Sequence, residues 1–225
     1  MSRRVLAATL AALTLSASSL SAQTVYSNGA PTNLNGNAIG QRFEQAHDFV
    51  LGASTSLGAF NWWAIVYPYS SPETIQADYT VSVYQNTEGS PGTSLFSQTF
   101  LSQTGTSDGS YCCANYLVDY KGYTFSANLG GLTLGPGTYW ISVTGFSVDN
   151  AYWLQAASNG SLAEHQSYGG GWQSTGFASG EGAFNLTATP ATDVPEPASL
   201  ALVASGFLGL AVIARRRRGG LRTIV

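Results

Sequence analysis

The chain has 225 residues, a formal net charge of −3, and only 9% charged side chains. Its wealth of Gly, Ser, Thr, Asn and aromatic residues favours strands and tight turns over long helices, and the aromatics exclude disorder. Within residues 23–190 only Arg42 and Lys121 oppose ten acidic side chains, a net charge of −8. Such a surface repels phosphate backbones, so nucleic acid is excluded as a partner.

The first 22 residues predict a secretory signal peptide, helical in the precursor. Arg3 and Arg4 precede the apolar run Val5–Leu15, which is too short to span a bilayer, and small residues follow up to Ala22. We expect export through the Sec translocon and cleavage by signal peptidase after Ala22, with a cut near Ser18 or Ser19 as an alternative. An uncleaved anchor is the other interpretation.

Residues 23–190 predict one all-β domain. Tyr79–Tyr84 and Thr138–Thr144 alternate between apolar and other residues, so each presents one face to a core. Further strands are expected at Asp48–Leu51, Phe60–Tyr67, Leu95–Phe100, Tyr123–Leu129, Tyr152–Ala156 and Ala183–Ala188. No segment shows a sustained 3.6-residue period. We expect a single antiparallel β-sandwich of about eight to ten strands, jelly-roll-like, between the signal helix and a C-terminal transmembrane helix.

The same residues offer no evident catalytic group. A Ser-His-Asp site needs a positioned base and a group that orients it. His47 and His165 are far apart, and Asp48, beside His47, would point to the opposite face of a strand. No His-x-x-x-His or Cys-x-x-Cys spacing occurs, so zinc is not expected. We therefore expect no catalytic residues, no cofactor and no enzyme activity.

Acidic residues leave two minor hypotheses open. Calcium is the first, with Asp108, Asp149 and Glu181 as ligands, although Asp-Gly and Asp-Asn pairs are ordinarily turn residues. A secreted carbohydrate-active enzyme is the second, because two carboxylates about 5–10 Å apart would suffice. Nothing in the sequence pairs the available residues, which are Glu88, Asp108, Asp149, Glu164 and Glu181.

Cys112 and Cys113 are the only cysteines and are adjacent. In an oxidising compartment they form a vicinal disulfide, pair with another chain or stay free, and these alternatives remain open. A redox site would require Cys-x-x-Cys.

Three tryptophans are candidates for stacking on a sugar ring. Trp62 and Trp63 are consecutive in a predicted strand, so one faces the core and the other the opposite side. Trp172 follows three glycines and is expected in a flexible loop. The competing interpretation is that all three pack under neighbouring loops, because aromatic side chains serve mainly burial.

The C-terminal segment predicts a membrane span. Ala198–Ala214 is seventeen residues without a charge, bounded by Pro195 and Pro197 before it and by arginines after it. At ~1.5 Å per residue the run measures about 25 Å, the short end of what crosses a bilayer core. Positive charge stays cytoplasmic, so the C-terminus, residues 219–225, is inside. Residues 191–193 form a linker from the domain to this segment.

Pro-Glu-Pro, a short apolar span and an arginine cluster, in this order, resemble the PEP-CTERM sorting signal of exopolysaccharide-producing Gram-negative bacteria. The resemblance covers residues 194–218 and implies processing by an exosortase, a membrane cysteine protease/transpeptidase. The recognition element would be Val194, Pro195, Glu196 and Pro197. The retention element would be Arg215, Arg216, Arg217 and Arg218. An ordinary single-pass anchor is the alternative.

The domain also resembles the β-sandwich ectodomains often attached to such tails. The features concerned are Asp48–Leu51, Trp62-Trp63, Gly92-Thr93, Leu134-x-x-Gly137-Thr138-Tyr139-Trp140 and Ala183–Leu186. This resemblance implies a fold and no activity.

Together these features predict an exported, non-enzymatic protein of the cell surface or extracellular matrix. It would reside transiently in the membrane, be sorted and cleaved by an exosortase, and associate with exopolysaccharide or biofilm. The alternatives are a secreted carbohydrate-binding or carbohydrate-active protein, and a coat protein that binds no sugar.

Overall fold

The computed structural model of the chain describes residues 22–40, 43–67, 72–112, 120–144, 150–157, 163–167, 170–174 and 180–190. All of them belong to the unit that ends at Pro190. No helix within these ranges is long and apolar enough to cross a membrane. The expected signal helix, the linker 191–193 and the C-terminal span lie outside the described residues.

The described residues form twelve strands. In chain order these are β1 (Thr24–Ser27), β2 (Pro31–Ala38), β3 (Phe43–Leu51), β4 (Thr55–Tyr67), β5 (Thr74–Thr87), β6 (Ser90–Cys112), β7 (Tyr120–Leu134), β8 (Gly137–Thr144), β9 (Asn150–Ala156), β10 (Ala163–Ser167), β11 (Gln173–Ser174) and β12 (Phe184–Ala188).

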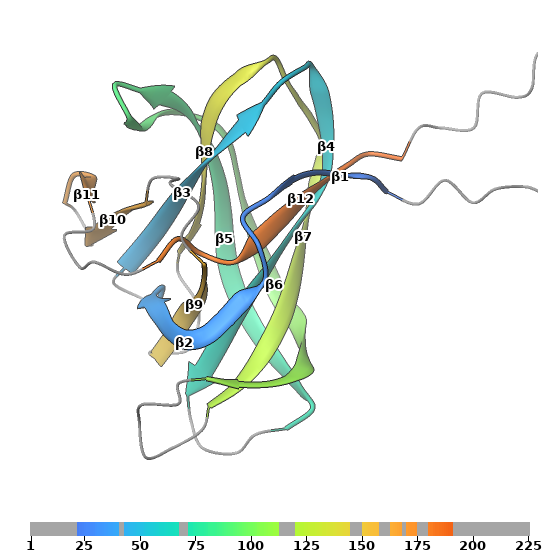
Figure 1. Cartoon of the computed structure of the whole chain (residues 1–225), viewed down its shortest axis with the longest axis vertical. Coiled ribbons are helices and arrows are strands. Elements are labelled where there is room, and N and C mark those ends of the chain that lie inside the picture. The colour runs from blue at the N-terminus through green and yellow to red at the C-terminus, as the bar shows by residue number, and fades with distance from the viewer. Residues whose placement is uncertain are drawn as a thin grey trace, which may run out of the picture. The chain divides into compact units, whose positions relative to one another are not determined.

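These strands join in one antiparallel sheet, which curls (Figure 1). Its order is β1-β12-β4-β7-β6-β5-β8-β3-β10-β11, and β9 pairs with both β4 and β2. Tyr26 of β1 donates a hydrogen bond to the Asp48 carbonyl of β3 at 3.4 Å, and its ring lies 5.9 Å from that of Phe49. Side chains of β1 therefore meet those of β3, and the sheet forms a half-barrel around its core.

The all-β prediction is confirmed, but the two-layer sandwich is replaced by this single sheet. The reason lies in the length of the central strands, since β4 has 13 residues and β6 has 23. Register shifts between Leu57 and Ala59, and between Ala77 and Tyr79, interrupt the ladders. Bulges of this kind bend a strand and increase its twist, so long strands can serve both sides of one core.

Each predicted strand falls within an observed one, except that the predicted Ala183–Ala188 begins one residue before β12. The alternation in β5 is confirmed, because Tyr79, Val81 and Val83 are at most 1% exposed. Strands β1, β2, β10 and β11 were not predicted, and β6 extends well past the predicted Phe100. Strands β1, β10 and β11 have only four, five and two residues, and β2 is polar and contains Gly36, so none shows the sustained alternation that marks a half-buried strand.

Aromatic rings fill the inner face of the sheet. Trp62 is fully buried, and its ring centroid lies 4.9 Å from that of Phe125 and 5.9 Å from that of Trp153. Phe60 and Phe184 pack edge-on against Trp153 at 5.7 and 5.9 Å. Burying such large side chains supplies most of the driving force for this fold.

Candidate functional site

A row of hydroxyl groups crosses the outer face of β6, β5 and β8. Opposed residues of antiparallel ladders share a face, and Ser82 is paired with Ser97 on one side and with Ser142 on the other. The hydroxyls of Ser82 and Ser97 share a hydrogen bond at 2.9 Å, as do those of Thr80 and Thr99. Ser97 and Thr99 are exposed, whereas Ser82 and Ser142 are buried, so the row is open to solvent on β6 and covered towards β8.

The row ends at Glu44 of β3, which is 8% exposed. Tyr84 of β5 donates its hydroxyl proton to Glu44 Oε1 at 2.8 Å, and Ser142 of β8 donates to the same atom at 2.5 Å. Burial, and after it the negative charge of Glu44, raise the pKa of Tyr84 to about 12. The phenol therefore stays protonated and remains a donor to the carboxylate.

Trp172 packs on this network. Its ring lies 5.6 Å from that of Tyr84 at an interplanar angle of 76°. Trp172 immediately precedes β11, and β10, β3 and β8 separate β11 from β5 in the sheet. The segment around Trp172 therefore crosses the outer face as far as Tyr84, where the indole is half-buried.

The other stacking candidates lie elsewhere. Trp62 is wholly inside the core, so the proposal that it stacks on a sugar does not apply. Trp63 is half-buried on the outer face of β4, where it packs against Ile65 and Leu154. Of the three predicted tryptophans, only Trp172 lies beside the hydroxyl row.

His47 is a core residue rather than part of a catalytic site. It is fully buried, its ring lies 4.5 Å from that of Trp153, and the Gly182 N–H donates to it 3.1 Å from Nδ1. Burial lowers the pKa of His47 to about 3, so the ring is neutral. Asp48 follows on the opposite face, as predicted. The side chain of His165 lies outside the described residues, and its backbone pairs with Gln45.

The predicted calcium ligands are not brought together within the described ranges. Asp108 is exposed in β6, whereas Glu181 is 4% exposed ahead of β12. Asp149 lies outside the described residues. Among the described residues, no group of three or more His, Cys, Asp and Glu side chains is arranged to hold a metal ion. Cys112 ends β6, but its side chain and Cys113 lie outside the described residues, so the disulfide hypothesis keeps its alternatives.

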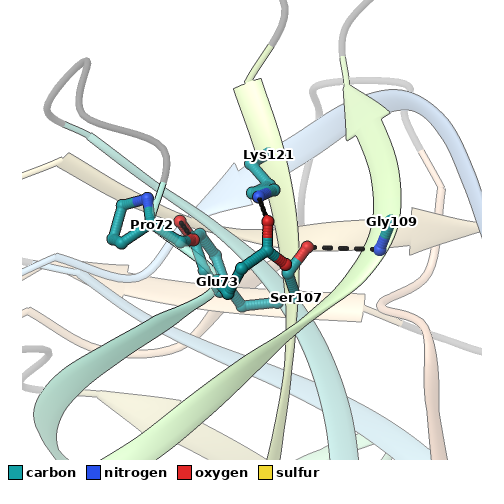
Figure 2. A network of polar contacts seen from close by, with 6 residues as sticks. Pro72, Glu73, Ser107, Gly109 and Lys121 are labelled. Atoms are coloured by element: carbon teal, nitrogen blue, oxygen red, sulfur yellow. Dashed lines mark hydrogen bonds and ion pairs between the residues drawn. The ribbon is translucent and has the colours of Figure 1, made fainter.

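Figure 2 shows a second polar network, where β5, β6 and β7 meet. Lys121 Nζ donates to Glu73 Oε1 at 2.6 Å; the lysine side chain is 7% exposed and the glutamate 85%. The Ser107 N–H donates to the Glu73 carbonyl at 2.8 Å, and the Tyr123 hydroxyl to the Pro72 carbonyl at 3.0 Å. The network fastens the start of β5 to its neighbours.

The sequence-based site prediction missed a Gly-x-Ser-x-Gly pattern, which is typical of a nucleophilic serine. It is formed by Gly105-Thr106-Ser107-Asp108-Gly109, beside this network. A nucleophile elbow is a sharp turn from strand to helix, whereas these residues lie within β6. Ser107 Oγ accepts a hydrogen bond from the Gly109 N–H at 3.2 Å. A Cβ on Gly105 would lie 2.4 Å from the Phe125 ring, so this glycine is required by packing.

The two ends of the domain meet at an open hollow of about 600 Å³ on the β12–β4–β7 side. Small residues line it, among them Gly58 and Gly131, and so do Ala22 and Pro190. The Ala188 N–H donates to the Gln23 carbonyl at 2.8 Å. The predicted signal-peptide junction and the start of the linker therefore leave the domain side by side.

The described part of the chain is thus an all-β domain with a polar outer face and with adjacent termini. Residues 193–218 match the PEP-CTERM protein-sorting motif. The chain carries this sorting signal, as the resemblance at Val194–Pro197 and Arg215–Arg218 indicated, and an exosortase is its implied processing partner. Such a tail implies export and a transient membrane-anchored state before processing. Neither a search of curated proteins nor one of solved structures found a match.

Proposed function

We propose that the protein is a non-enzymatic component of the cell surface or extracellular matrix, which an exosortase cleaves and which associates with exopolysaccharide. The observation that carries this proposal is the PEP-CTERM motif at residues 193–218, attached to a domain that ends at Pro190. In this proposal Val194–Pro197 is the recognition element. Arg215–Arg218 hold the C-terminus in the cytoplasm until cleavage.

The position of the termini supports processing at both ends. Ala22 and Pro190 line the same hollow. The signal peptide and the tail of the precursor therefore leave the domain at neighbouring points, and both can be held in the membrane at once. The domain can fold outside the membrane before either cut. Signal peptidase then acts after Ala22 and the exosortase at or near Pro195.

The placement of titratable groups supports a binding role over catalysis. His47 is neutral and enclosed by the core, and Lys121 is paired with Glu73. Glu44 accepts hydrogen bonds from two hydroxyls at a single oxygen. General acid–base catalysis needs such groups within reach of a substrate proton, whereas here each is engaged in holding strands together.

The test is the mass of the mature protein. We expect deletion of Val194–Pro197 to leave the tail attached in a host that has an exosortase, while deletion of the four residues Leu221–Ile224 leaves processing intact. Intact-mass spectrometry of membrane and secreted fractions gives the answer. The proposal is contradicted if the mature protein has the same mass with and without the first deletion. It is also contradicted if the wild-type protein reaches the same mature mass in a host without exosortase.

A further inference from the structure

We propose that the outer face of β6 and β5, bordered by Trp172, binds a strand of neutral polysaccharide. The inference rests on the proposed association with exopolysaccharide and names the surface and the ligand chemistry. We call this surface the hydroxyl face and define it by the exposed or half-buried Thr80, Tyr84, Ser97 and Thr99, together with Trp172. The buried Ser82, Ser142 and Glu44 lie beneath it and hold these side chains in place.

The hydroxyl pairs offer a sugar polymer a repeating set of partners. Thr80 pairs with Thr99 and Ser82 with Ser97 across one ladder. Each hydroxyl both donates and accepts, so a pair engaged in one hydrogen bond retains capacity for a second. Strands lie about 4.8 Å apart and side chains on one face recur every second residue. The exposed Ser97 and Thr99, each hydrogen-bonded to a hydroxyl of β5, form a row of polar groups that suits an extended chain of hydroxyl-bearing rings.

The partners of Trp172 pre-organise it for stacking. Its ring meets Tyr84 edge-to-face, and Tyr84 is in turn fixed by its hydrogen bond to Glu44. Ser142, which is fully buried, holds the same carboxylate oxygen. An aromatic residue fixed in this way loses little entropy on binding. The indole combines an apolar face, which matches the C–H face of a pyranose, with an N–H donor.

Charge selects the kind of polysaccharide. The domain carries −8 between residues 23 and 190, with Arg42 and Lys121 as its basic residues. Lys121 is ion-paired with Glu73, where β5, β6 and β7 meet. A uronate, sulfate or phosphate polymer would be repelled by this domain. The ligand therefore consists of uncharged hexose units.

The experiment is affinity electrophoresis of the full chain, purified in mild detergent. The native gels contain hydroxyethylcellulose, dextran or galactomannan as neutral polymers, or alginate as the acidic one. We expect at least one neutral polymer to retard the wild-type protein and alginate to leave its mobility unchanged. Trp172→Leu should weaken retardation at least tenfold, as loss of a central aromatic anchor does. The matched variant Trp63→Leu should bind as wild type.

A second pair of variants keeps the test independent of the Trp172 segment. Thr99→Val removes an exposed hydroxyl of the hydroxyl face and should weaken retardation severalfold, whereas Thr133→Val removes an exposed hydroxyl of β7 and should not. The inference is overturned if Trp172→Leu and Thr99→Val are retarded as strongly as the wild-type protein. It is also overturned if alginate retards the wild-type protein as much as the neutral polymers do, or if no neutral polymer retards it. The mature mass is independent of these outcomes: normal processing without retardation rejects the hydroxyl face alone, and retardation without processing rejects the sorting role.

Discussion

The Tyr84 hydroxyl donates to Glu44 Oε1 at 2.8 Å, joining β5 to β3 across the intervening strand β8. The same carboxylate oxygen receives the Ser142 hydroxyl of β8. Three strands are thereby fastened at one buried acceptor, and Trp172 packs on the tyrosine of this network. Structural stability and the geometry of the hydroxyl face depend on the same contact.

We predict that Tyr84→Phe lowers the free energy of unfolding by about 1–3 kcal/mol. The substitution removes one donor from a carboxylate that is 8% exposed, and a buried charge that loses a hydrogen bond costs this much. Urea unfolding followed by tryptophan fluorescence measures the change. Tyr139→Phe is the matched control, because its exposed hydroxyl bonds to the Gly135 carbonyl at 3.2 Å and its loss should cost less than about 1 kcal/mol. Equal losses in both variants would contradict the role given to Glu44.

The sequence predicted the alternating strands of this fold but not how they associate. Tyr79, Val81 and Val83 reveal their inward face by period two alone. The Glu44–Tyr84 contact joins residues 40 positions apart, and no local pattern specifies such a pair. The single sheet was missed for the same reason, since closure depends on long-range pairing and on bulges.

Glycine in strands was a second source of error. Glycine is disfavoured inside strands, yet Gly105 lies in β6, where the Phe125 ring covers it. Trp172 was identified as a candidate from its residue type, but its partner Tyr84 comes from a distant strand. The tail was recognisable because its signal is local: a motif, an apolar run and a charge cluster in fixed order.

The adjacent tryptophans of β4 should differ in their contribution to stability. Trp62→Ala removes a fully buried ring that packs against Phe125 and Tyr79, so we expect a loss of about 3–5 kcal/mol. Trp63 is half-buried, and Trp63→Ala should cost clearly less. Thermal unfolding of both variants checks the order. A larger loss for Trp63→Ala would mean that the inner and outer faces of β4 are assigned wrongly.

Gly182 should not tolerate a methyl group. A Cβ at this position would lie 2.6 Å from Trp153 and 2.7 Å from the His47 ring, both of which are fully buried. Overpacking of a core typically costs about 1–3 kcal/mol, so Gly182→Ala should lower the unfolding midpoint accordingly. Gly52→Ala is the control, since nothing lies within 4 Å of its added Cβ and the stability should stay nearly unchanged. A tolerated Gly182→Ala would contradict the close approach of the Gly182 backbone, just ahead of β12, to His47.

His47 should make the domain less stable in acid. Its pKa is lowered to about 3 in the folded protein, from 6.5 for an unperturbed histidine. Between these values the unfolded chain binds the extra proton, so the histidine's contribution is complete above about pH 6.5 and is lost progressively as the pH falls towards 3. Carboxylates also titrate in acid, so the comparison is with His47→Asn, which retains an acceptor for the Gly182 N–H but does not titrate. We expect the free energy of unfolding of the wild type to fall more steeply between pH 7 and pH 5 than that of the variant. Parallel curves over this range would show that His47 is not enclosed as a neutral ring.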